Sequence, residues 1–150
     1  MKCESFFQES FKTLTINARG LANPLTYNFL FDLIEKSNSD VCFVQETLIH
    51  SESTIKSLSR RWLGRSFWSP DSGKLGGVVT LISPKCSNEI VSWKDSQGRI
   101  VSVLIRCNDY DIDLVNIYAP TERKSFFVSI HEFFIPSSAT IIGEIGRAHV

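Results

Sequence analysis

The sequence predicts one α/β domain whose sheets contain both parallel and antiparallel strands. Its first part reads as strand, helix and strand, the pattern of a crossover between parallel neighbours. Its middle part, from 67 to 118, joins short β-prone segments through turn residues, which is typical of antiparallel pairing. At 150 residues and 43% hydrophobic composition, the chain has the length of one domain and enough apolar residues for a core.

The first elements follow from local signals. A strand is expected at Thr13–Ile16, and Asn23 followed by Pro24 suits the N-cap and first position of a helix. The apolar face of that helix is expected to comprise Leu25, Phe29, Leu30, Leu33 and Ile34. The segment Asp40–Gln45 contains the apolar run V-C-F-V, typical of a strand buried on both faces, and Ser51–Trp62 has helical spacing of its apolar residues.

The later elements are mainly strands. We expect them at Phe67–Ser69, Gly77–Ser83, Ile90–Trp93, Ile100–Arg106 and Asp111–Tyr118, with a Gly- and Pro-containing loop at 69–76. The segment Ser125–Phe134 predicts a short core helix whose aromatic stripe serves packing, with His131 exposed. Thr140–Ile142 predicts one more buried strand.

Three of the expected strands end at a side chain that carries oxygen. Asn17, Glu46 and Tyr118 each follow such a strand, and open α/β sheets form binding crevices at strand ends. Amide and carboxylate oxygens suit a hard cation such as Mg²⁺. Two simpler readings stay open: Asn17 can be a turn residue, and Glu46 can merely solvate the end of its strand.

Four motifs resemble the endonuclease/exonuclease/phosphatase superfamily in order and spacing. They are L-T-I-N-A-R-G-L (14–21), V-Q-E-T (44–47), G-G-V-V (76–79) and N-I-Y-A-P-T (116–121). That superfamily includes DNase I, the apurinic/apyrimidinic endonucleases and the inositol polyphosphate phosphatases. The Y-A-P-T and G-K-L-G-G-V segments look most like the endonuclease domain of non-LTR (LINE-type) retrotransposons. The resemblance covers Thr13 to Gly143 and implies an incomplete four-layer DNase I-like sandwich, with mixed sheets and outer helices.

The resemblance also implies a function. The parent protein would be a Mg²⁺-dependent (or Mn²⁺-dependent) endonuclease that nicks target DNA for reverse transcription. Glu46 would bind the metal, Asn17 would orient the metal or the phosphate, and Tyr118 would hydrogen-bond the phosphate or the nucleophile. Arg19 and Asn116 are further candidates for substrate binding. The alternatives are a phosphoinositide phosphatase, a repair nuclease of the apurinic/apyrimidinic type, or a binding remnant without catalysis.

The resemblance stops abruptly after Gly143. The superfamily continues this strand as G-D-x-N, whereas this chain reads E-I-G-R-A-H-V and ends. We therefore expect residues 1–143 to be the N-terminal part of such a domain, and residues 144–150 to be non-native adapter read-through. The Asp and Asn of that motif, and a later Asp-His pair, have no counterparts here. Since general acid–base steps each contribute on the order of 100- to 10,000-fold, the chain by itself should be almost inactive.

Composition bears on the partners, the redox environment and the location that we expect for the protein. The net charge is zero, with 16 basic and 16 acidic residues, so no overall basic footprint points to nucleic acid. Cys3, Cys42, Cys86 and Cys107 form no C-x-x-C pair and are expected to be reduced. With no signal peptide and no apolar run of membrane-spanning length, we expect a nuclear or cytoplasmic protein that is neither secreted nor membrane-bound.

Overall fold

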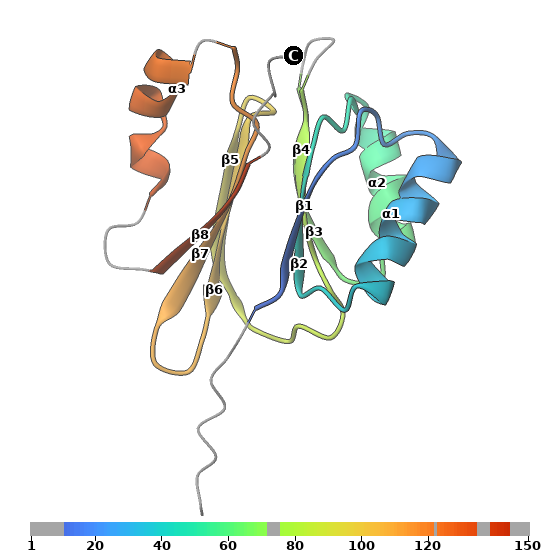
Figure 1. Ribbon diagram of the computed structural model, residues 1–150, viewed down its shortest axis with the longest axis horizontal. Coiled ribbons are helices and arrows are strands. Elements are labelled where there is room, and N and C mark those ends of the chain that lie inside the picture. Colours follow the sequence, from blue (N-terminus) through green and yellow to red (C-terminus); the bar gives the residue numbers. More distant parts are fainter. Residues whose placement is uncertain (1–10, 72–75, 122, 135–138, 145–150) are drawn as a thin grey trace, which may run out of the picture.

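Two four-stranded sheets pack face to face, and helices cover their outer faces, so the chain forms four layers (Figure 1). The computed structural model describes residues 11–71, 76–121, 123–134 and 139–144. The elements of the first sheet and its helices are β1 (Thr13–Asn17), α1 (Pro24–Lys36), β2 (Val41–Gln45), α2 (Glu52–Arg61), β3 (Arg65–Ser69) and β4 (Val78–Ile82). The second sheet and its helix comprise β5 (Ile90–Ser96), β6 (Ile100–Arg106), β7 (Asp111–Ile117), α3 (Arg123–Ser129), the 3-10 turn His131–Phe133 and β8 (Ala139–Glu144).

Both sheets are mixed, as the sequence predicts. The first sheet has the order β1-β2-β4-β3, and only β1 and β2 are parallel. The second has the order β5-β6-β7-β8, and only β7 and β8 are parallel. The parallel pair β1–β2 is the one joined by helix α1, because a parallel connection needs a crossover segment. The predicted α/β class is therefore confirmed.

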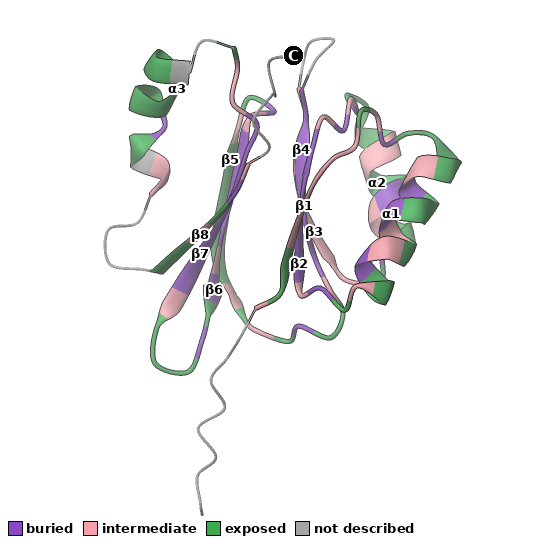
Figure 2. Cartoon of the chain, in the orientation of Figure 1, coloured by how far each residue is buried: buried purple, intermediate pink, exposed green. Residues whose placement is uncertain are grey.

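The main core lies between the sheets and consists of alternate residues of β2, β4, β6 and β7. Figure 2 shows that buried residues are concentrated in these facing strands. Phe43 is the largest of its fully buried side chains, and it faces the second sheet at Gly143 of β8. A second core joins the outer face of the first sheet to α1 and α2, and includes Leu30, Ile34, Cys42 and Leu58. The two central strands of the first sheet, β2 and β4, are thus buried on both faces, as the apolar run V-C-F-V predicts for β2.

The predicted apolar face of α1 is only partly right. Leu30 and Ile34 are buried, and Tyr27 joins them, but Leu25 and Phe29 are 80% and 68% exposed. The helix carries two apolar stripes, and hydrophobic spacing alone does not choose between them. The choice follows from α2, whose end places Trp62 against Phe31 at a ring-centroid distance of 5.2 Å.

Two expectations near the C-terminal end are also corrected. The predicted core helix Ser125–Phe134 is a short helix that ends at Ser129 and is followed by a 3-10 turn. It covers only one end of the second sheet, so Ile130 is buried while Phe127 is 39% exposed; His131 is exposed, as predicted. The strand expected to be buried at 140–142 is β8, which lies at the edge of its sheet and leaves Ile142 53% exposed.

The cysteines within the described residues are free and buried, as expected. Cys42, Cys86 and Cys107 form no disulfide, and Cys3 lies outside the described residues. Burial raises the pKa of the Cys42 thiol to about 12, so this thiol stays protonated and behaves as a small apolar group. These three cysteines therefore serve packing rather than chemistry.

A buried carboxyl group on the outer face of the second sheet makes stability depend on pH. Burial raises the pKa of Asp113, against the hydrogen bond that Ser102 Oγ donates to it at 2.5 Å and the charge of Lys94. Because the folded state favours the neutral acid, this group stabilises the fold at low pH, and that stability is lost as pH rises through the raised folded pKa.

We expect Asp113→Asn to increase the free energy of unfolding by about 1 kcal/mol at pH 7, because it removes a buried charge while keeping an acceptor for Ser102. The gain should shrink towards pH 3.8, the ordinary pKa of the group. Thermal unfolding at both pH values measures the difference, with the exposed Asp95→Asn as the control. A gain that is the same at both pH values would contradict the assignment.

Candidate functional site

The ends of three strands meet at one edge of the sandwich. Strands β1 and β2 are parallel, so the residues that follow them leave the sheet side by side, and Gly20 N–H donates to Glu46 O at 2.8 Å. Tyr118 follows β7 in the opposite sheet, and its hydroxyl donates to Glu46 Oε1 at 2.7 Å. The structure therefore brings Glu46 and Tyr118 together, although 72 positions separate them in the chain.

The backbone around Glu46 has an uncommon conformation. Glu46 and Leu48 both have a φ of 53°, in the left-handed region that side chains disfavour. The loop is held by bonds from Thr47 N–H to Gly77 O and from Leu48 N–H to Gly76 O, each 3.0 Å long. Gly77 has a φ of 83°, and a Cβ at this position would overlap Thr47 Oγ1. The G-G pair of the third motif thus supports the loop that presents Glu46.

Asn17 lies on the same side of the first sheet as Gln45, its register partner, and this side faces the second sheet. Its Oδ1 accepts a bond from Arg19 N–H at 3.1 Å, so the turn role considered above is present. A carbonyl oxygen has two lone pairs, and this bond leaves one for a ligand. Arg19 is exposed in the same loop, with a φ of 48°.

Asn116 is not positioned to contact a substrate, and this candidate is corrected. It is fully buried between the sheets, where its Oδ1 accepts from Gln45 Nε2 at 2.8 Å. Its Nδ2 donates to Val79 O at 2.9 Å and to Val44 O at 3.3 Å. Both ends of the amide are therefore used within the core, beneath the site rather than in it.

Arg99, which follows the turn between β5 and β6, is a further candidate that its local sequence does not reveal. Its guanidinium carbon lies 4.8 Å from the centre of the Tyr118 ring, and Nη1 donates to Tyr118 O at 3.5 Å. The segment D-S-Q-G-R (95–99) has the residues of a hairpin turn, and nothing local distinguishes its arginine from a solvated one. The neighbouring Gly98 N–H donates to Ser69 Oγ at 2.9 Å, which anchors this turn to the first sheet.

The donor atoms at this edge fit a hard cation that keeps most of its water. Glu46 contributes a half-buried carboxylate and Asn17 an amide oxygen, and Mg²⁺ is commonly bound by one or two carboxylates plus water. Within the described part of the chain, no three His, Cys, Asp or Glu side chains form a cluster that could hold a metal.

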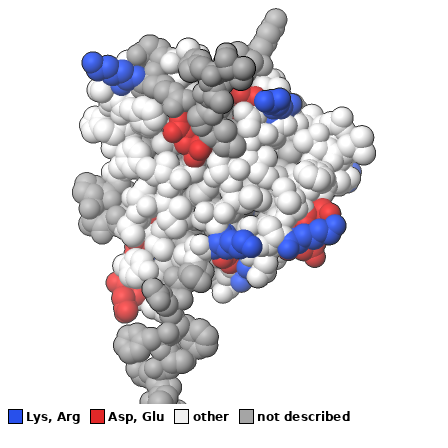
Figure 3. Space-filling model, viewed as in Figure 1, with Lys and Arg blue, Asp and Glu red and all other residues white. Residues whose placement is uncertain are grey.

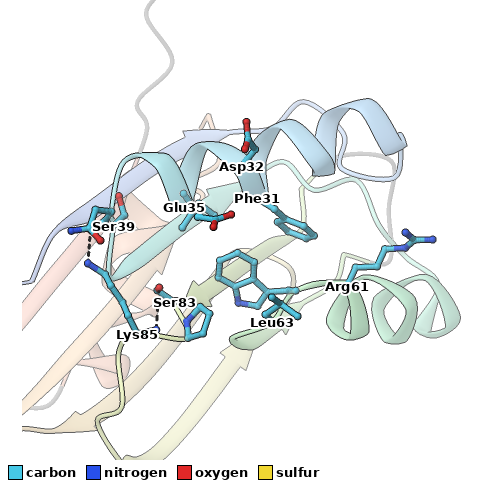
Figure 4. A pocket seen from close by; sticks show the side chains of 12 residues that line it. Phe31, Asp32, Glu35, Ser39, Arg61, Leu63, Ser83 and Lys85 are labelled. Carbon is cyan, nitrogen blue, oxygen red and sulfur yellow. Dashed lines mark hydrogen bonds between the residues drawn. The ribbon is translucent and has the colours of Figure 1, made fainter.

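A separate pocket of about 500 Å³ lies at the other end of the first sheet (Figure 4). Phe31 and Glu35 of α1, Leu63 after α2, and Ser83 and Lys85 after β4 line it. Lys85 is already bound to Asn38 O at 2.6 Å. The pocket shares none of its lining residues with the Glu46 edge.

The comparisons with known proteins agree with this fold. No family model matches the chain. An uncharacterized 149 kDa protein of transposon TX1 from Xenopus laevis is 31% identical over 124 residues, which is 79% of this chain and 9% of that protein.

Two solved structures are similar at the level of the fold. An AP endonuclease from Leishmania major matches with a TM-score of 0.64 at 19% identity, covering 82% of this chain and 47% of that one. The endonuclease domain of TRAS1, a telomere-specific non-LTR retrotransposon, matches with a TM-score of 0.62 at 16% identity. The match covers 89% of this chain and 59% of the TRAS1 domain. The chain thus spans about half the length of these structures. It has the DNase I-like fold of the endonuclease/exonuclease/phosphatase proteins that its motifs resemble.

Proposed function

We propose that this chain is the metal-binding and phosphate-positioning part of a Mg²⁺-dependent endonuclease domain from a retrotransposon-type protein. The observation that carries the proposal is the bond between Glu46 and Tyr118, which joins two motif residues from opposite sheets at one edge. The transposon TX1 relative favours a retrotransposon parent over a phosphoinositide phosphatase or a repair nuclease. The TRAS1 endonuclease and the AP endonuclease match the fold about equally well, so the fold is compatible with a retrotransposon parent without selecting it. The substrate of the parent would be DNA, within the nucleus or cytoplasm.

Each side chain has a definite role in this proposal. Glu46, with Asn17, would hold the metal, which when bound polarises a phosphate oxygen and stabilises the leaving oxygen. Tyr118 donates a hydrogen bond to the Glu46 carboxylate and would orient it, and its hydroxyl would also contact the phosphate. Arg99, beside the Tyr118 ring, and Arg19, in the loop after β1, would supply positive charge to the DNA backbone.

DNA binding by the parent would rest on this local charge rather than on the whole surface. On the face drawn in Figure 3, acidic and basic side chains are interspersed and form no large basic patch. The chain is neutral overall. None of the helices in the described ranges is long and apolar enough to cross a membrane.

The residues that would complete the chemistry belong to the second half of the domain. We propose that the source gene continues after Gly143 with G-D-x-N, and that residues 144–150 are adapter read-through. Strand β8 pairs with β7 as far as Glu144, which lies opposite Ile117. Tyr118 directly follows Ile117, so the residues that continue β8 in the proposed gene would lie beside Tyr118. A long sequencing read across codon 143 of the source locus tests this directly. A locus that truly encodes E-I-G-R-A-H-V and stops would leave a binding remnant without catalysis.

The metal site can be tested in the chain as it stands. We expect Mn²⁺ to broaden the amide resonances of residues 17–21 and 45–48 in ¹H–¹⁵N spectra, and Mg²⁺ to reverse the broadening by competition. Glu46→Gln should weaken this binding by at least about tenfold, because it removes the carboxylate. Glu52→Gln, an exposed acid on α2, is the matched control and should bind as the parent does. Equal broadening in Glu46→Gln would place the metal elsewhere.

A further inference from the structure

Directly beneath the Glu46–Tyr118 edge, two buried amides connect the sheets. Gln45 immediately precedes Glu46, and Asn116 stands two residues before Tyr118, on the same face of β7. Gln45 Nε2 donates to Asn116 Oδ1 at 2.8 Å, and both residues are fully buried. The amide pair is thus adjacent in sequence and in space to the two residues of the site.

The bonds of Asn116 fix the second sheet on two strands of the first. Its Nδ2 donates to Val44 O of β2 and to Val79 O of β4, while its Oδ1 is bound to Gln45. Apolar contacts between sheets permit sliding, because they have no preferred direction, whereas these bonds specify one lateral position. That position determines whether Tyr118 reaches Glu46 Oε1.

A second observation is that burying Gln45 costs more free energy than burying an apolar residue of similar size would. Gln45 Oε1 is buried and has no hydrogen-bond partner among the described residues. A methionine or leucine would fill the same space without an unsatisfied oxygen, which is costly in a core. The bond to Asn116 is therefore the feature of Gln45 that an apolar residue cannot replace.

We propose that Gln45 and Asn116 are positioning residues, forming an amide clamp that holds Tyr118 on the Glu46 carboxylate and so sets the affinity of the metal site. The clamp acts through Glu46 and Tyr118 and touches neither metal nor substrate. This inference rests on the proposed function for its metal readout, but the Glu46–Tyr118 bond can be measured without any metal.

The test replaces both amides with apolar residues of similar shape, in the double variant Gln45→Met with Asn116→Leu. Replacing both partners of the Gln45–Asn116 bond can be nearly neutral for stability, but the variant also removes the bonds from Asn116 Nδ2 to Val44 O and Val79 O. We therefore expect a moderate fall in the melting temperature of a chain that still folds. We expect the Mn²⁺ affinity at Glu46 to fall about tenfold, as for residues that orient metal ligands. The ¹³Cζ resonance of Tyr118, which reports its hydroxyl bond, should move towards that of a solvated tyrosine.

Ser102→Ala is the matched control, since it removes a buried hydrogen bond from the outer face of the same sheet. It should change neither the Mn²⁺ affinity nor the Tyr118 resonance. If the double variant does not fold, Gln45→Met alone carries the test: it removes only the bond to Asn116 Oδ1, so the Tyr118 resonance and the Mn²⁺ affinity should change in the same direction but by less. A parent that binds no Mn²⁺ would refute the metal site, while the Tyr118 resonance would still decide the clamp. A folded variant with both readouts unchanged would overturn the clamp.

Discussion

Glu46→Gln should reduce Mg²⁺-dependent nicking of supercoiled DNA by the longer endonuclease domain on the order of 1,000-fold. The substitution keeps the size of the side chain and an oxygen for the Tyr118 hydroxyl, but it removes the negative charge. Metal ions contribute several kcal/mol to the stabilisation of charge at a reacting phosphate, and each 1.36 kcal/mol is a factor of ten in rate. The loss should therefore appear mainly in the rate of the bound complex and in its metal dependence.

Conversion of supercoiled plasmid to the nicked circle, at several Mg²⁺ concentrations, measures this effect. Glu52→Gln should nick at the parental rate, since this side chain is exposed on α2 and lies outside the site. Nicking by Glu46→Gln within threefold of the parent would remove Glu46 from the metal site.

Gly143→Ala should lower the free energy of unfolding of this chain by about 3 kcal/mol. The glycine is buried in β8, and a Cβ at this position would overlap the Phe43 ring. Phe43 is fully buried between the sheets, so the ring has little room to move, and overpacking of a tight core typically costs about 1–3 kcal/mol. For a chain of this length the melting temperature should fall by roughly 6–12 °C.

A double-mutant cycle with Phe43→Leu identifies the cause of the loss. The smaller side chain leaves space for the added methyl group, so Gly143→Ala should cost less in the Phe43→Leu background than in the parent. Thr140→Ala, at an exposed position of the same strand, should change stability little. Strict additivity of the two core substitutions would show that the cost arises from the backbone of β8 and not from the ring.

Local patterns were sufficient for most of the secondary structure. The cap predicted at Asn23 is present, because such a side chain satisfies the first free amides of a helix wherever it packs. The run V-C-F-V is a strand buried on both faces, since no other element of that length tolerates apolar residues on every side. By contrast, the buried stripe of α1 was mispredicted, because two apolar stripes were available and only Trp62 and the sheet selected one.

The candidate site also contains residues that local sequence indicated and residues that only the structure revealed. Glu46, Asn17 and Tyr118 could be named from the sequence, because they follow strand-like runs and lie in motifs. Arg99 could not be named from the sequence, since it is a candidate only because its guanidinium lies over the Tyr118 ring, 19 positions further along the chain. Asn116 was assigned to the substrate from its motif, and only its burial against Gln45 and Val79 revealed it as part of the core.

By itself, then, the sequence determined the class of fold, the order of the strands along the chain and the residue types at their ends. These features depend on short-range periodicity and on the chemistry of single residues. The tertiary structure alone decided which stripe of α1 is buried and which strand ends meet. It did so because sheet packing joins residues far apart in the chain, as when Tyr118 of one sheet binds Glu46 of the other at 2.7 Å.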